Sequence, residues 1–279
     1  MKKIFKPILL TSCAIALASC LASCDIENIK NNDEIKEYNN TNDSSDVDFI
    51  ALTTKLSTET IEAHVRIEAS FYQRSRMSYQ MVASSIGSGV IIEEVKEGNH
   101  VYYYCLTNNH VIYNEYSYAT YVVEDCYENE FSAEVIYQSS EYDLALLKFE
   151  FKDSTDELKV IELAESDPET DELVATLGES NAISNTLTYG YITGTKVINP
   201  NVETINESNV TFEVLTHDAY IQSGCSGGSL LNVNSELVGI NFASSYFDDK
   251  YLSSYAIPVS KIKEFIEICE QKDSNFIYE

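Results

Sequence analysis

Short runs of alternating apolar and polar residues, separated by turn residues, recur along most of this chain. The first run, AHVRIEASFY at 63–72, alternates as a half-buried strand does. Further strand candidates are SGVIIEEV, VYYYCLTN, YATYVVED, FSAEVIYQ, LALLKFEF, ELVATLGE, TLTYGYITGTKV, TFEVLTHDAY, SELVGINFA and SYAIPV. Many short strands with few helices favour an all-β fold, either a barrel or a sandwich.

One helix is expected near the end of the chain. Ile262, Phe265, Ile266 and Cys269 recur at the spacing of one helix face, with Ser260 as a possible N-cap. This helix is expected to dock on the β-domain. The chain ends soon afterwards, so no further folded module is expected.

The first 24 residues have the features of an export signal. A basic start, MKKIFK, precedes an apolar stretch that is too short for a permanent membrane span. The stretch ends in LASC twice, and this tetrapeptide resembles the bacterial lipobox, whose cysteine is lipidated after cleavage. Cys24 is the preferred lipidation site because the sequence turns polar at the next residue, and Cys20 is the alternative. A plain signal peptide with incidental cysteines also remains open.

Composition separates a tether from a folded domain. Residues 25–54 begin with an Asn-rich, acidic stretch of low apolar content, which predicts a disordered tether, and residues 55–279 form the domain. The net charge of -27 would repel phosphate backbones, so nucleic-acid binding is not expected.

Four cysteines remain after cleavage: Cys105, Cys126, Cys225 and Cys269. They form no CxxC pair, so a metal site is not expected. An exported protein could pair them in disulfides, but the sequence does not choose among the possible pairings.

The stretch IQSGCSGGSLLN, 221–232, crowds three glycines around Ser226. A serine nucleophile needs a base, an orienting carboxylate and N–H donors for the developing oxyanion. Gly224 permits a strained turn that could aim its own N–H and that of Ser226 into one oxyanion hole. On this stretch alone, a glycine-rich hairpin is an equally good interpretation.

Two other stretches supply the partners of a serine nucleophile. His110 follows the strand candidate YYYCLTN, at a loop edge where a general base could be held. Asp143 precedes the apolar strand LALLKFEF, where partial burial would let its carboxylate orient one histidine tautomer. The order His, Asp, Ser, with gaps of 33 and 83 residues, predicts a catalytic triad. His64, His100 and His217 have poorer contexts, although His217 could touch a substrate cleft.

LTNNHV, DLALLK and GCSGGSLLNVNSELVGINFA resemble the trypsin-like serine peptidases of the bacterial Deg/HtrA type. SSIGSGVII, ELVATLGESNAISNTLTYGYITG and SYAIPVSKIKEFI extend the resemblance over about residues 60–268. The resemblance implies two six-stranded antiparallel β-barrels with the triad at their junction. His110 would be the general base, Asp143 its orienter and Ser226 the nucleophile, with the oxyanion hole at Gly224 and Ser226.

Some positions depart from the family pattern. Cys225 stands where the family usually has Asn, and Ser223 replaces a common proline. Cys225 could be mistaken for the nucleophile, but the register of the motif favours Ser226. No PDZ domain is expected.

The resemblance also indicates a primary substrate pocket. Tyr220 would lie at its base, while Asn241, Phe242 and Ala243 would line one wall. Because Tyr220 is not an acid, a preference for Lys or Arg is not expected. Barrel packing is the alternative role for these residues.

We therefore expect an exported, lipid-anchored serine endopeptidase that acts on protein or peptide substrates and needs no metal or organic cofactor. An adhesion or binding protein built on an impaired peptidase fold is one alternative, and an esterase or acyl transferase is another. The sequence leaves open whether the protein is a monomer or, as in some family members, a trimer.

Overall fold

The computed structural model describes residues 60–152, 157–180, 183–198, 209–247 and 250–278. The predicted signal peptide at 1–24, with Cys20 and Cys24, and the predicted tether at 25–54 lie outside these residues. Within the described ranges, no helix has the length and apolar character needed to cross a membrane.

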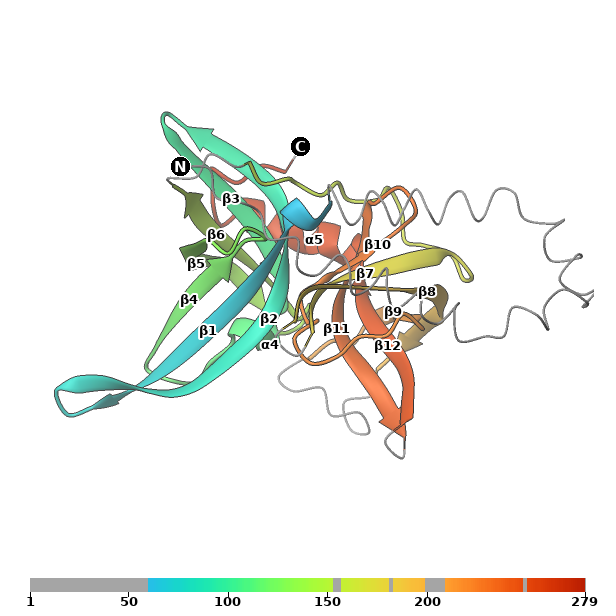
Figure 1. Ribbon diagram of the computed structural model, residues 1–279, viewed down its shortest axis with the longest axis horizontal. Helices are drawn as coiled ribbons and strands as arrows, with labels where there is room; N and C mark the ends of the chain where they lie inside the picture. The colour runs from blue at the N-terminus through green and yellow to red at the C-terminus, as the bar shows by residue number, and fades with distance from the viewer. Residues whose placement is uncertain (1–59, 153–156, 181–182, 199–208, 248–249, 279) are drawn as a thin grey trace, which may run out of the picture. The chain divides into compact units, whose positions relative to one another are not determined.

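The first six strands close into an antiparallel barrel (Figure 1). Its strands, in the order β1-β2-β3-β6-β5-β4, surround an apolar interior. Their bounds are β1 His64–Ser75, β2 Ser78–Glu97, β3 His100–Thr107, β4 Tyr118–Glu124, β5 Glu130–Ser139 and β6 Leu144–Phe151. A 3₁₀ helix, η2 at Thr60–Ala63, precedes β1, and the short helix α4, Asn109–Ile112, follows β3.

The last six strands close into a second antiparallel barrel in the order β10-β11-β12-β9-β8-β7. Their bounds are β7 Leu173–Ser180, β8 Ile183–Val197, β9 Glu213–His217, β10 Ser229–Leu231, β11 Leu237–Phe247 and β12 Lys250–Pro258, and α5 follows at Val259–Glu270. The predicted all-β fold of two six-stranded barrels with a C-terminal helix is confirmed.

Strand β6 is apolar along its first half because both of its faces are buried. Leu147 points into the interior of the first barrel, whereas Leu146 belongs to a core that the two barrels share with α5. Neighbouring side chains on a strand point to opposite faces, so a strand buried on both sides needs apolar residues in sequence. Strand β3 repeats this arrangement with Cys105 and Leu106.

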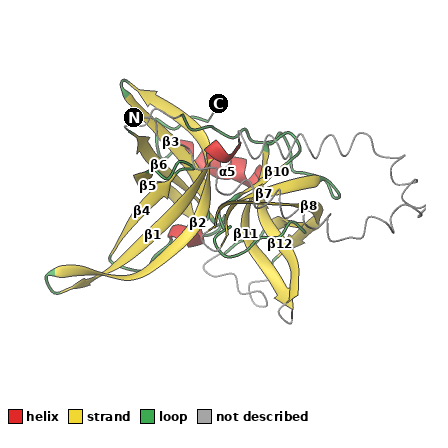
Figure 2. Cartoon of the chain, in the orientation of Figure 1, coloured by secondary structure: helices red, strands yellow, loops and turns green. Residues whose placement is uncertain are grey.

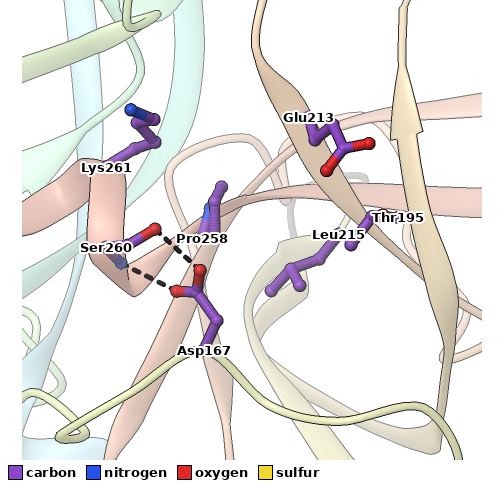
Figure 3. Close-up of a pocket in the computed structure, with 7 residues that line it drawn as sticks. All are labelled: Asp167, Thr195, Glu213, Leu215, Pro258, Ser260 and Lys261. Atoms are coloured by element: carbon purple, nitrogen blue, oxygen red, sulfur yellow. Dashed lines mark hydrogen bonds between the residues drawn. The ribbon is translucent and has the colours of Figure 1, made fainter.

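Helix α5 buries the face that the sequence predicted: Ile262, Phe265, Ile266 and Cys269 all lie in the shared core. The prediction that Ser260 is the N-cap is wrong, because the helix begins at Val259. Instead, Asp167 from a distant loop accepts hydrogen bonds from the backbone N–H and the hydroxyl of Ser260, at 2.8 and 2.7 Å (Figure 3). A carboxylate at this position satisfies an N–H group that the first helical turn leaves unpaired.

Two histidines, His64 on β1 and His217 on β9, are buried. The ring of His64 donates from Nδ1 to the carbonyl of Thr60 at 2.8 Å, so its Nε2 accepts from the hydroxyl of Ser229. His217 is fully buried, and its Nε2 donates to Oδ1 of Asn241 at 3.1 Å. Burial lowers the pKa of each ring to about 4.

These two histidines should make the protein less stable in mild acid. The unfolded chain protonates each ring near pH 6.5, but the folded chain does so only near pH 4. Between these values the unfolded state binds more protons, so the free energy of unfolding falls as the pH falls, by about 1.4 kcal/mol per pH unit for each ring.

Urea unfolding at pH 6 and at pH 5 measures this slope. The variant His64→Gln should lose about half of the histidine contribution to the difference between the two pH values. A slope that is the same in the variant and in the wild type would contradict the assignment.

Candidate active site

The loop that ends β3 and the loop that enters β10 meet at the junction of the barrels. Helix α4, which carries His110 and is labelled in Figure 1, is the short red helix at the edge of the first barrel in Figure 2. A Cβ atom at Gly87 would lie 2.7 Å from the side chain of Val111 and 3.0 Å from the carbonyl oxygen of Ser226. The residue after His110 and the predicted nucleophile therefore pack against the same point of β2.

Asp143 holds His110 with both of its carboxylate oxygens. Oδ2 accepts from the ring Nδ1 at 2.8 Å, and Oδ1 accepts from the backbone N–H of His110 at 3.0 Å. The carboxylate is fully buried rather than partly buried as predicted, and its backbone has φ of +50°. Its own carbonyl oxygen accepts from the side-chain amide of Asn108 at 2.9 Å.

This contact fixes the tautomer of His110. Because a carboxylate only accepts, Nδ1 carries the proton in the neutral ring, and the lone pair then lies on Nε2. The side chain of His110 remains 19% exposed, so the ring is only partly covered. An imidazole oriented in this way can act as a general base on a neighbouring hydroxyl.

Ser88 on β2 holds the loop around Ser226 in place. Its backbone N–H donates to the carbonyl of Ser226 at 2.8 Å, and its hydroxyl donates to the carbonyl of Gly224 at 2.8 Å. Its own carbonyl accepts from the hydroxyl of Thr107 at 2.7 Å. The first barrel thus fixes both ends of the Gly224–Ser226 segment, next to the strand that leads to His110.

The hydrogen bonds of His110 in the described part of the chain run to Asp143, and none joins its ring to Ser226. Catalytic hydrogen bonds are often long or misaligned before substrate binds and tighten in the complex.

The backbone N–H groups in the Ser226 loop divide into two sets. Three of them donate within the protein at 2.9 to 3.0 Å: Cys225 to the carbonyl of Gln222, Gly227 to that of Asn241, and Gly228 to that of Cys225. Those of Gly224 and Ser226 donate to no group among the described residues. Gly224 has φ of +99°, a conformation that glycine adopts without strain. The N–H groups of Gly224 and Ser226 are the two that the sequence predicted for the oxyanion hole.

A family model of the trypsin-like peptidase domain matches residues 87–240. This chain belongs to the trypsin-like peptidase family. Within it, the chain is similar to the Deg/HtrA type: it is 32% identical to "Periplasmic serine endoprotease DegP" of Salmonella typhimurium over 64% of this chain and 34% of that protein. It is 31% identical to "Serine protease Do-like HtrA" of Bacillus subtilis over 71% of this chain and 42% of that protein.

Among solved structures, the crystal structure of the serine endoprotease from Yersinia pestis matches this trypsin-like peptidase with a TM-score of 0.56 and 28% identity. The match covers 78% of this chain and 66% of that chain. The chain spans 34% to 42% of the length of the first curated relatives that it matches.

Cys225, the residue before Ser226, is buried and hydrogen-bonded to the second barrel. Its thiol is 5% exposed and donates to the carbonyl of Glu179 on β7 at 2.7 Å. Burial raises the pKa of Cys225, which disfavours the reactive thiolate. The side chain therefore contributes to loop packing, and its environment argues against a nucleophilic role. Cys105 and Cys269 are also buried thiols, and no disulfide joins cysteines within the described ranges.

The residues predicted for the substrate pocket of the peptidase occupy different environments. Tyr220 is 41% exposed and makes an edge-to-face contact with Tyr251, with ring centroids 5.0 Å apart. Asn241 is buried, and its side-chain amide donates to the carbonyl of Ser229. Phe242 is 2% exposed and lies in the shared core, with Ala243 packed against that core. These placements favour the packing alternative for Asn241 and Phe242.

The other histidines lie apart from this arrangement. His217 is fully buried, so it does not reach a cleft, and His64 is buried beside β10. His100 is exposed and pairs with Glu150. The contribution of Ser88 was missed at the sequence level, although SSIGSGVII was recognised as a family match. Its role depends on contacts with residues far along the chain, which only the fold brings together.

Proposed function

We propose that this protein is an exported serine endopeptidase that cleaves peptide bonds through Ser226, His110 and Asp143. The proposal is carried by the two hydrogen bonds that Asp143 accepts from His110, one from the backbone N–H and one from Nδ1 of the ring. They orient the imidazole so that its Nε2 can act as the base. The names of the curated relatives, which describe serine endoproteases, support the same reaction class.

The reaction proceeds in two halves. The hydroxyl oxygen of Ser226 attacks the carbonyl carbon of the peptide bond while Nε2 of His110 takes its proton. The N–H groups of Gly224 and Ser226 stabilise the oxyanion of the tetrahedral intermediate. The imidazolium then gives its proton to the leaving amine, and an acyl-enzyme ester remains.

Water completes the reaction. His110 takes a proton from a water molecule, which attacks the ester carbonyl, and the imidazolium returns that proton to Ser226 as the acid product leaves. Asp143 stays ionised throughout and stabilises the charged imidazolium. No step uses a metal or an organic cofactor.

The location and the substrates are part of this proposal. The export signal and Cys24 favour a lipid-anchored protein that faces the extracytoplasmic side, and two of the curated relatives are named as periplasmic. The substrates would be proteins or peptides. Tyr220 at the predicted pocket supplies no negative charge for Lys or Arg.

A fluorophosphonate probe tests the reaction class. The purified wild type should be labelled, and peptide mapping should place the phosphonate on Ser226. Prior treatment with iodoacetamide, which reacts with accessible thiols, should not prevent labelling. Cleavage of casein would then separate an endopeptidase from an esterase. A protein that is folded but neither labelled nor able to cleave casein would support the alternative of an adhesion or binding protein.

The same labelled sample tests the anchor. A lipidated protein partitions into the detergent phase of Triton X-114, and Cys24→Ser should move it to the aqueous phase. If the variant stays in the detergent phase, Cys20 or the uncleaved signal is responsible.

A further inference from the structure

Strands β1 and β2 continue past the first barrel as a two-stranded hairpin, which projects from it in Figure 1. Their register pairs Tyr72 with Met81 and Arg74 with Tyr79. Arg76 and Met77 form the turn at the tip, and Met77 is wholly exposed. We call residues 72–81 the ribbon.

The two faces of the ribbon differ in chemistry. Residues that pair across an antiparallel ladder share a face, and neighbours along a strand lie on opposite faces. One face, which we call the aromatic face, carries Tyr72, Arg74, Tyr79 and Met81. The opposite face carries Gln73, Ser75, Ser78 and Gln80.

Strand β4 extends the aromatic face. Tyr118 pairs with Tyr72 across the sheet, and its ring centroid lies 5.7 Å from that of Tyr72 and 5.8 Å from that of Tyr79. Tyr79, Met81 and Tyr118 are 55%, 62% and 52% exposed. These exposed side chains lie together on one face of the sheet, and exposed apolar surfaces of this kind mark interaction sites.

The ribbon also differs from the rest of the chain in charge. No Asp or Glu occurs from Ala69 to Ile92, although the chain holds 45 acidic residues and has a net charge of -27. The charges in this stretch are those of Arg74 and Arg76. Neither arginine takes part in the salt bridges found among the described residues. The ribbon is therefore a cationic, aromatic projection from an acidic protein.

We propose that the aromatic face of the ribbon lies on a lipid surface that bears anionic headgroups. Tyrosine rings favour the boundary between headgroups and acyl chains, and arginine can bury its stem there while its guanidinium stays with the phosphates. Pairing between β1 and β2 satisfies the inward-facing backbone groups along the ribbon, which lowers the cost of entering a medium of low polarity. Repulsion of the acidic remainder by the same surface orients the tip towards the lipid.

A second copy of the chain is a poorer occupant. A two-fold contact packs the same patch against itself, so it would bring Arg74 and Arg76 towards the same two arginines of the other molecule. The net charge of each chain would add to the repulsion. The lipid proposal goes beyond the proposed peptidase reaction and depends on neither the triad nor the acyl anchor.

The chain contains no tryptophan. The fluorescence of a single introduced tryptophan therefore reports on the surroundings of that position alone. The full-length Tyr79→Trp protein is mixed with vesicles of phosphatidylcholine and phosphatidylglycerol whose acyl chains are brominated. We expect the emission to shift to the blue and to be quenched. Tyr191→Trp is the matched control, because Tyr191 is also an exposed strand tyrosine, at 52%, but lies on β8. Its emission should not change, even if acyl chains hold the protein on the vesicle.

A second set of variants tests the role of charge. In the Tyr79→Trp background, Arg74→Gln with Arg76→Gln should lower the equilibrium constant of the lipid-bound ribbon by about 30-fold. Molar salt should have an effect in the same direction. Equal quenching at both indole positions, or none at position 79, would overturn the proposal. A blue shift that grows with protein concentration in the absence of lipid would assign the face to a second copy instead.

Discussion

Replacing Asp143 with asparagine is expected to lower kcat by about 10⁴-fold while leaving KM almost unchanged. The side chain keeps its size, and one amide oxygen can still accept from the backbone N–H of His110. The amide nitrogen, however, would stand where Oδ2 now accepts from Nδ1. Because that nitrogen donates, it favours the tautomer with the proton on Nε2, which cannot take the proton of Ser226. Steady-state rates on a fluorogenic peptide measure the loss.

Two further variants give the lower limit and the control for this measurement. Ser226→Ala removes the proposed nucleophile and should lower kcat by about 10⁶-fold, which gives the residual rate for comparison. Glu150→Gln removes a carboxylate from another histidine, His100, in an exposed pair away from the junction, and should leave kcat unchanged. An Asp143→Asn enzyme with a rate within about tenfold of the wild type would mean that the buried carboxylate does not set the tautomer.

The strands could be predicted from the sequence because short runs, either alternating or continuously apolar, lie between clear turns. The predicted segment 101–108, for example, became β3 at His100–Thr107. Strand β10 was missed because it has three residues, Ser229–Leu231, directly after the glycines of the nucleophile loop. The full lengths of β1 and β2 were also missed, since the ribbon is held by cross-strand pairing outside the barrel and lacks a buried face.

The candidate triad could be predicted because His110 and Asp143 each adjoin a recognisable strand and three glycines surround Ser226. Contacts between distant segments could not. Asp167 replaces Ser260 as the group that satisfies the start of α5, although the two residues are 93 positions apart. Ser88 fixes the carbonyl of Gly224 across a separation of 136 positions. Local sequence patterns carry no signal for such contacts, which arise only when the chain folds.

The packing of Gly227 predicts a large loss of stability on substitution. A Cβ atom there would lie 2.1 Å from the carbonyl oxygen of Ser88 and 2.3 Å from the hydroxyl of Thr107. These two atoms are hydrogen-bonded to each other, and the backbone N–H of Ser88 holds Ser226. The chain cannot make room unless the loop around Ser226 moves away from the first barrel. With φ at +86°, we expect Gly227→Ala to lower the free energy of unfolding by about 4 kcal/mol.

Gly98 offers a matched control, because it also has a positive φ, of +64°, but has nothing within 4 Å of the position of a Cβ atom. Gly98→Ala therefore incurs the conformational cost alone, about 1 kcal/mol. Urea unfolding of both variants separates steric conflict from backbone strain. The Gly227→Ala protein that remains folded should also lose peptidase activity, since Ser226 must move with its neighbour, while Gly98→Ala should keep it. Equal losses of stability in the two variants would show that the close packing of Gly227 against Ser88 adds nothing to the cost of backbone strain.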